Sequence, residues 1–224
     1  MEASSVSDFN NHKISESEII TKILSGQKEL FEILLRRNNQ KLYRAIRSYI
    51  KDEHEIEDLM QNAHIKAYEK LSQFRFSSSY STWLIRIGIN EALARLKEKG
   101  KIININGEFQ RANSNSILEM SDTTQLNPER KIMQQEAKLI LETTIDQLPI
   151  KYKSVFILRE VEELSTNETA ECLGITVANV KVRNHRAKSI LKEQLFNLTK
   201  NANIYEFGFS RCDRITENVM MKIL

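Results

Sequence analysis

The 224-residue chain contains few residues that interrupt or cross-link a polypeptide: two prolines, six glycines and two cysteines. Pro and Gly are common in the turns and hairpins that connect short strands, so their scarcity disfavours a fold of many short strands. Leu, Ile, Lys, Glu and Ala recur at helical spacing instead of in alternation. We therefore predict an all-α fold.

The two cysteines, Cys172 and Cys212, fall in different predicted elements and form no CxxC pair. This spacing supports neither a disulfide framework nor a zinc knuckle. The four histidines are scattered, and His54 and His64 lack the separation of four that places two imidazoles on one metal ion. We expect no metal site, no cofactor and a reducing compartment.

Long apolar runs are also absent, so no segment is suited to span a bilayer, and the N-terminus lacks the charged start and hydrophobic centre of a secretion signal. We expect a cytoplasmic protein without membrane insertion. The net charge of only +3 argues against a wholly basic packaging protein. It favours a local basic patch that acidic surface elsewhere balances.

Changes in composition divide the chain. Ser15 and Glu18 can cap a first helix after a polar start, and Asn127 with Pro128 restarts helix after a stretch rich in Asn, Ser and Gly. The predicted organisation is two small helical domains joined by a flexible linker. Its parts are a disordered tail (1–15), a first domain (16–99), the linker (100–127), a second domain (128–198) and a C-terminal tail (199–224).

The second domain carries the signals of a helix-turn-helix. Ser165 and Glu168 form a potential capping box, Gly174 suits the tight turn, and Thr176 can cap the next helix. We expect the helix after Pro128 to cover this motif by packing its apolar face on it. That face consists of Met133, Ala137, Ile140, Leu141, Thr144 and Leu148.

The last helix of this motif is basic on one side, because no acidic residue occurs between Ile175 and Lys192. Asn179 and Asn184 add side chains that can pair with base edges. The cations of this helix are Lys181, Arg183, Arg186, Lys188 and Lys192. A solvated basic face is the alternative, but the helix-turn-helix context favours a DNA-reading helix.

A second feature is the loop SQFRFSSSYSTW, residues 72–83, which interleaves a cation with aromatic rings. Such a combination can hold the backbone of a single nucleic-acid strand while bases stack on the rings. We expect this role for Arg75, Phe76, Tyr80 and Trp83. The alternative is that the rings seal the core, which we favour for Phe74 but not for Tyr80 or Arg75.

Asp52 through Asp58 hold five carboxylates at a predicted helix start, where acids complement the positive end of the helix dipole. A metal-dependent enzyme acting on nucleic acid needs clustered carboxylates, and this run has no partner cluster elsewhere. We therefore expect that the chain is not an enzyme.

The tail places Cys212, Ile215, Val219 and Ile223 along an amphipathic helix. Docking of this helix on the second domain is the expected arrangement. A redox-sensing Cys212 or a regulator-binding helix is the alternative.

Three segments occur in a characteristic order: DLMQNAHIKAYEKL, then FRFSSSYSTWLIRIGINEALARL, then LPIKYKSVFILREVEELSTNETAECLGITVANVKVRNHRAKSIL. In this order the chain resembles bacterial sigma factors of the extracytoplasmic-function (ECF) type, over roughly residues 20–197. The resemblance implies a transcription initiation factor that directs core RNA polymerase to promoters and assists melting. Its first domain resembles sigma region 2 and its second resembles sigma region 4.

The resemblance also implies partners: the clamp helices of the largest polymerase subunit, the flap of the second-largest, promoter DNA and, as a candidate, an anti-sigma factor. The resemblance assigns core polymerase binding to Asp58, Leu59, Met60 and Gln61. It assigns binding of the melted minus-ten strand to Arg75, Phe76, Ser79, Tyr80, Trp83, Arg86 and Asn90. It assigns binding of the minus-thirty-five element to Asn179, Lys181, Arg183, Arg186 and Lys188.

The rival interpretation is a stand-alone helix-turn-helix transcriptional regulator with an N-terminal sensor or dimerisation domain. It predicts tight operator binding without polymerase. The loop at residues 72–83 distinguishes the two, because a sensor domain has no reason to contain it.

Overall fold

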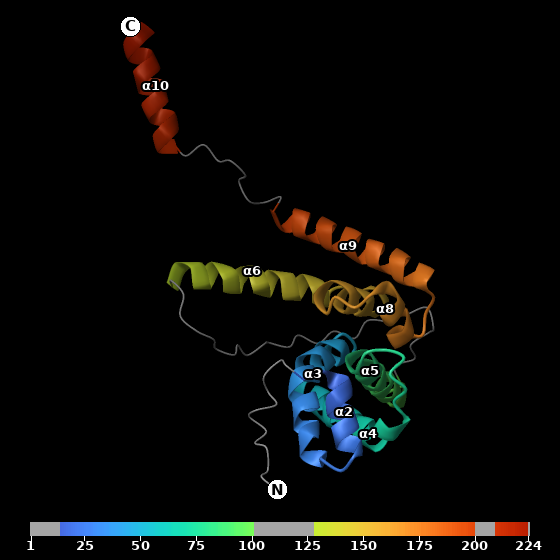
Figure 1. Cartoon of the computed structure of the whole chain (residues 1–224). Coiled ribbons are helices and arrows are strands. Elements are labelled where there is room, and N and C mark those ends of the chain that lie inside the picture. The colour runs from blue at the N-terminus through green and yellow to red at the C-terminus, as the bar shows by residue number, and fades with distance from the viewer. Residues whose placement is uncertain (1–13, 101–127, 200–208, 224) are drawn as a thin grey trace.

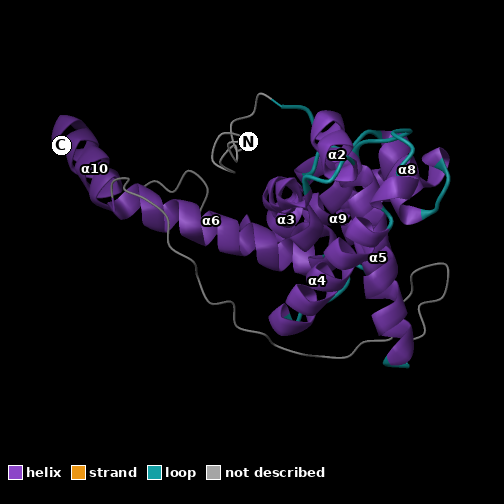
Figure 2. Ribbon diagram, turned by 60° about the horizontal axis from the view of Figure 1, so that its bottom comes forward, coloured by secondary structure: helices purple, strands orange, loops and turns teal. Residues whose placement is uncertain are grey.

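The computed structural model describes residues 14–100, 128–199 and 209–223. Most of the predicted N-terminal tail and linker therefore lies outside the described residues. All regular secondary structure in the described ranges is helical, which confirms the predicted all-α class (Figure 2).

The first half of the chain folds into a compact group of helices (Figure 1). Its elements are α2 (Glu16–Leu24), η1 (Lys28–Leu30), α3 (Phe31–Arg47), α4 (Glu53–Glu69), η2 (Leu71–Gln73) and α5 (Tyr80–Glu98). Side-chain caps fix three of the helix starts. The Ser15 hydroxyl, the Asp52 carboxylate and the Ser79 hydroxyl each accept a hydrogen bond from the N–H three residues later.

The core of this half lies between α3, α4 and α5, with α2 closing one side. Its fully buried side chains include Ile19, Ile33, Leu42, Ile46, Ile56 and Leu84. Gly88 of α5 lets α3 approach closely, because a Cβ at this position would overlap the Leu42 side chain. The crossing of α3 and α5 therefore requires the missing side chain.

The second half contains the predicted helix-turn-helix. Its elements are α6 (Pro128–Asp146), α7 (Ile150–Phe156), the π-helical turn η3 (Ile157–Val161), α8 (Thr166–Leu173), α9 (Val177–Thr199) and α10 (Phe209–Ile223). The capping box is confirmed, since Ser165 and Glu168 exchange both hydrogen bonds. Gly174 takes the left-handed conformation at φ 62°, and the Thr176 hydroxyl accepts from the N–H of Asn179.

Two expectations about this half are wrong. Helix α6 packs on the helix-turn-helix only at its C-terminal end. Thr144 of α6 and Leu148, just after it, are buried, whereas Ile140 and Leu141 are about half exposed. The rest of α6 projects away from the helix-turn-helix (Figure 2), so no described helix covers the apolar residues in its middle. The tail helix α10 does not dock on the second domain, and its Ile215 and Val219 are also about half exposed.

The two halves are not independent in this structure. Helix α5 of the first half packs on α8 of the second. A buried apolar cluster joins Ala45, Ile85 and Ile89 to Leu158, Leu164 and Cys172. The sequence indicated two separate cores, and this third cluster forms because α5 also carries apolar residues on the side that faces away from the first core.

Replacement of Gly88 by Ala should lower the free energy of unfolding by about 1–3 kcal/mol, because the added methyl must displace Leu42 in a filled core. Urea unfolding monitored by circular dichroism measures this change. The matched control is Ala94→Ser at an exposed position of the same helix, which should change stability by less than about 0.5 kcal/mol. Equal stability of Gly88→Ala and the wild-type chain would contradict the close approach.

Candidate functional site

The first candidate surface is the outer face of α4. Asp58 and Gln61 are exposed there, and Met60 is half-buried. Leu59 is only 3% exposed and belongs to the core, so its predicted direct contact with a partner protein does not fit this structure. Leu59 instead anchors the helix, because its helical position turns it toward α3 and α5.

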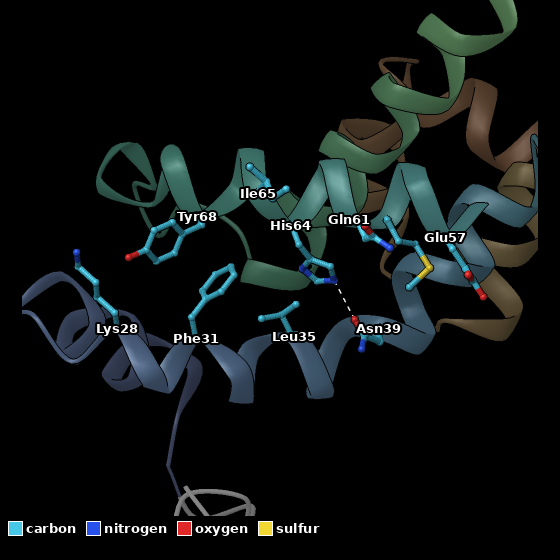
Figure 3. Close-up of a pocket in the computed structure, with 10 residues that line it drawn as sticks. Lys28, Phe31, Leu35, Asn39, Glu57, Gln61, His64, Ile65 and Tyr68 are labelled. Carbon is cyan, nitrogen blue, oxygen red and sulfur yellow. Dashed lines mark hydrogen bonds between the residues drawn. The ribbon is translucent and has the colours of Figure 1, made fainter. Parts of the chain in front are cut away.

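Beside these residues, α3 and α4 enclose a groove of about 650 Å³ (Figure 3). Phe31, Leu35 and Met60 contribute apolar lining, and Ile65 is 57% exposed along its edge. The rings of Phe31 and Tyr68 meet edge to face with centroids 5.0 Å apart. Exposed apolar side chains of this kind are typical of a protein-binding groove.

Figure 3 shows His64 at the base of this groove, turned toward Asn39. Its Nε2 lies 2.9 Å from the Asn39 Oδ1. Burial lowers the pKa of His64 below its ordinary value, which favours the neutral imidazole. This groove was not predicted from the sequence, although Ile65 and Tyr68 interrupt the polar face of α4 and were the available signal.

The second candidate surface is the aromatic loop before α5. Phe74 is buried, as predicted, and its ring lies 4.8 Å from that of Phe76 and 5.2 Å from that of Trp83. Tyr80 is only 2% exposed, which contradicts the expectation that it stands outside the core. Because Tyr80 is the first residue of α5, its ring turns inward against Phe74 and Trp83.

Phe76 is the ring that this loop exposes, at 50%. Its φ of 55° is rare for a residue with a side chain and lets the loop reverse direction at the aromatic cluster. Arg75 next to it is exposed, and so are Arg86 and Asn90 on the outer face of α5. Ser79 caps α5, with its hydroxyl accepting from the Thr82 N–H at 3.1 Å. The structure thus combines one exposed ring with cations on the adjacent helix.

The third candidate surface is the N-terminal half of α9. Asn179, Lys181 and Arg186 are exposed, whereas Val180 and Ala187 are buried beneath them. This division follows the predicted arrangement of a polar face above an apolar stripe.

Two other polar residues of α9 are tied to their own domain. The Lys188 ammonium lies 2.8 Å from Glu160 of η3, and the Asn184 amide donates to the same carboxylate at 2.7 Å. Hydrogen bonds from Lys188 and Asn184 lower the pKa of Glu160. Glu160 therefore competes with DNA for both residues, and this role of Glu160 was not predicted from the sequence.

A sequence model of sigma-70 region 2 matches residues 34–102, and a model of sigma-70 region 4 matches residues 138–191. The first match contains α4, the aromatic loop and α5, and the second contains the helix-turn-helix. The chain is also 29% identical to the ECF RNA polymerase sigma factor SigW of Bacillus subtilis, over 80% of this chain and 96% of that protein. The chain belongs to the ECF sigma factors.

Further relatives agree with this family. The ECF sigma-E factor of Escherichia coli is 27% identical over 83% of this sigma factor and 96% of its own length. Among solved structures, the sigma factor RpoE from Bartonella quintana, in complex with the anti-sigma factor NepR, has a similar fold. The TM-score is 0.56 at 21% identity, and the match covers 74% of this chain and 96% of RpoE.

The residues of this sigma factor that the structure describes offer neither a cluster of metal ligands nor a membrane-crossing helix. Among those residues, no three His, Cys, Asp or Glu side chains gather as metal ligands would. Every helix described also falls short of the length and apolarity that a bilayer crossing demands.

The buried ring of Tyr80 provides a test of its structural role. Its hydroxyl is buried without a hydrogen-bond partner among the described residues. Tyr80→Phe should therefore raise the free energy of unfolding by about 1 kcal/mol, since it removes an unsatisfied polar group. Tyr80→Ala should lower it by about 3–5 kcal/mol, since it empties the aromatic cluster. Thermal unfolding measures both, and a clear loss of stability in Tyr80→Phe would contradict the buried placement.

Proposed function

We propose that the chain is a sigma factor that binds core RNA polymerase, directs it to specific promoters and assists strand separation at initiation. The observation that carries the proposal is the pairing, within one chain, of a cationic reading helix with an aromatic loop edged by cations. The first lies in the match to region 4 and the second in the match to region 2. As a partner of polymerase on chromosomal DNA, the chain acts in the cytoplasm.

The proposed domains follow the sequence division, with a region 2 domain at 16–99, a linker at 100–127 and a region 4 domain at 128–198. Polymerase docking is proposed for the outer face of α4. Asp58, Met60 and Gln61 are accessible there, and the apolar groove continues the surface. An apolar strip beside acidic and amide side chains suits a helical partner with basic residues at its edge, and we propose that the clamp helices fill this role.

Promoter opening is proposed to depend on the loop and on α5. A base stacked on the exposed Phe76 ring contributes about 1–3 kcal/mol, and Arg75 can neutralise the adjoining phosphate. Trp83 is half-buried and supports the loop while part of its ring remains accessible. Arg86 and Asn90 extend the same surface along α5. The sigma factor supplies binding energy for this step, and no bond is made or broken by the chain itself.

Recognition of the minus-thirty-five element is proposed for the exposed face of α9. Asn179 has the paired donor and acceptor that recognise adenine in the major groove, and Arg186 has the fork that recognises guanine. Lys181 is placed to contact phosphate. Arg183 is half-buried and Lys188 is bound to Glu160, so their contacts with DNA require some rearrangement.

Two further partners are proposed on the family relationship. The flap of the second-largest polymerase subunit would position the region 4 domain. An anti-sigma factor is the other candidate, because the solved relative RpoE is complexed with the anti-sigma factor NepR. The stand-alone regulator is not favoured, because its sensor domain would not produce the match to sigma region 2 over residues 34–102.

Reversing the charge at Asp58 tests polymerase docking. Asp58→Lys should weaken binding to core polymerase by at least about tenfold, because a like charge would replace an opposite one at the edge of the contact. Fluorescence anisotropy with labelled sigma factor and purified core polymerase measures the affinity. Glu69→Lys, an exposed acid near the C-terminal end of the same helix, is the matched control and should bind as the wild type does. Equal binding by Asp58→Lys would remove α4 from the docking surface.

Removing the Lys181 charge tests the reading helix. Lys181→Ala should weaken holoenzyme binding to every promoter fragment alike and reduce the slope of log affinity against log salt by about 1, since one phosphate contact is lost. Lys138→Ala, an exposed cation on α6, is the control and should leave the slope unchanged. A wild-type slope for Lys181→Ala would show that this side chain does not touch phosphate.

A further inference from the structure

The polar side chains of α9 form two rows along the helix. Lys181, Asn184 and Lys188 follow one another at intervals of three and four residues, so they share one side of the helix. Asn179 and Arg186 are seven residues apart and share the other side. Both rows adjoin the exposed face of α9, so all five residues were expected to meet DNA.

One carboxylate already occupies most of the first row. The Oε1 atom of Glu160 lies 2.8 Å from the Lys188 ammonium, and the same oxygen accepts a hydrogen bond of 2.7 Å from the Asn184 amide. These hydrogen bonds hold the pKa of Glu160 below its ordinary value, so the carboxylate is ionised at neutral pH. Two of the three polar side chains on this side of α9 are therefore engaged within their own domain.

The backbone of η3 sets the position of Glu160. This π-helical turn contains a hydrogen bond of 2.9 Å from the Glu162 N–H to the Ile157 carbonyl. Leu158 of the same turn is 1% exposed and anchors it in the core. Turns of this kind are rare and occur frequently at functional sites. Glu160 is thus an acid on an anchored turn beside α9, unlike a carboxylate on a loose loop.

Asn184 cannot make a paired contact with a base in this arrangement. An asparagine recognises adenine in the major groove through both its amide donor and its carbonyl acceptor. The amide of Asn184 donates to Glu160, and its Oδ1 is buried without a hydrogen-bond partner among the described residues. Because that acceptor is buried, the paired contact cannot form. Asn179, by contrast, is exposed.

Lys188 can contact a phosphate only by leaving Glu160. A partly exposed ion pair is weak in water, and a single Lys–phosphate contact is of similar strength, so these two strengths do not decide the competition. The carboxylate decides it. Once Lys188 has left, Glu160 would face the phosphates with Asn184 as its remaining partner, and like charges so placed repel each other. The pair with Glu160 is therefore the favoured state of Lys188.

We infer that Glu160 determines which side chains of α9 read DNA, because it withdraws Asn184 and Lys188 and leaves Lys181 as the phosphate contact of that side. Base reading is then confined to the side that carries Asn179 and Arg186. This inference depends on the proposed function, since it concerns the helix proposed to bind the minus-thirty-five element. It replaces the DNA contact that the family resemblance implies for Lys188 with a contact inside the domain. Withholding one cation also limits the affinity for DNA of any sequence.

Removal of the Glu160 charge in the full-length chain tests the withdrawal of Lys188. Glu160→Gln keeps the size of the side chain and an acceptor for Asn184, but it no longer holds Lys188 by charge. The variant should bind a labelled duplex of random sequence about five- to tenfold more tightly at about 0.1 M salt, and the slope of log affinity against log salt should steepen by about 1. Fluorescence anisotropy over a series of salt concentrations measures both. Circular dichroism confirms that each variant is folded.

Lys188→Ala identifies the cation that is released. In the wild-type background this change should leave the salt slope unchanged, because Lys188 touches no phosphate there. In the Glu160→Gln background it should abolish the gain. Glu142→Gln is the matched control, because it removes the same charge from a Glu–Lys pair on α6, where Glu142 lies 3.8 Å from Lys138. This control should bind the duplex as the wild-type chain does.

The withdrawal of Asn184 is tested in the holoenzyme, with promoter fragments that are randomised at the minus-thirty-five element. Asn184→Ala should select the same sequences as the wild type, because this side chain reads no base. Asn179→Ala is the comparison and should relax the selection at one position.

The inference is overturned if Glu160→Gln binds the duplex no more tightly than the wild-type chain, or if the gain survives Lys188→Ala. It is also overturned if Lys188→Ala alone lowers the salt slope, or if Asn184→Ala changes the selected sequence. A wild-type holoenzyme that selects no sequence at all would contradict the proposed function instead. The duplex assay contains no polymerase, so its result on Glu160 would still stand.

Discussion

The structure depends on the burial of α5 on two sides. On one side Leu84 and Gly88 pack against α3 in the core of the first half, and on the other Ile85 and Ile89 meet the second half. The narrow remaining face carries Arg86 and Asn90. A single helix therefore supports the domain core, the proposed strand-binding surface and the contact between the halves.

The proposed polymerase-binding surface on α4 and the proposed strand-binding surface on α5 differ in how far the second half of the chain contacts them. The groove beside the acids of α4 is lined by residues of η1, α3 and α4, with none from the second half. On α5, Arg86 is engaged by the Glu171 carboxylate of the second half. The chain thus presents its proposed polymerase surface, while Glu171 engages one cation of its proposed strand-binding surface. This difference follows from charge placement instead of from net charge, which is only +3.

Local features could be predicted from the sequence because they depend on residues within one helical turn. The capping box at Ser165, the cap at Ser15 and the left-handed Gly174 are examples. The placement of Tyr80, the exposure of Ile140 and the contact through Ile85 could not, since each depends on which distant helix covers the residue. Apolar periodicity shows that a face prefers burial, but it does not show whether a partner helix is long enough or close enough to bury it. The site roles came from family resemblance and stay predictions.

The most direct test of the central claim is run-off transcription with purified core polymerase on a library of promoter fragments, with and without the chain. The account predicts that the chain brings about transcripts from a subset of templates, and that these templates share two sequence elements separated by a nearly constant spacing. If no template yields a transcript that depends on the chain, although the chain is folded and the polymerase is active with another sigma factor, the account is contradicted.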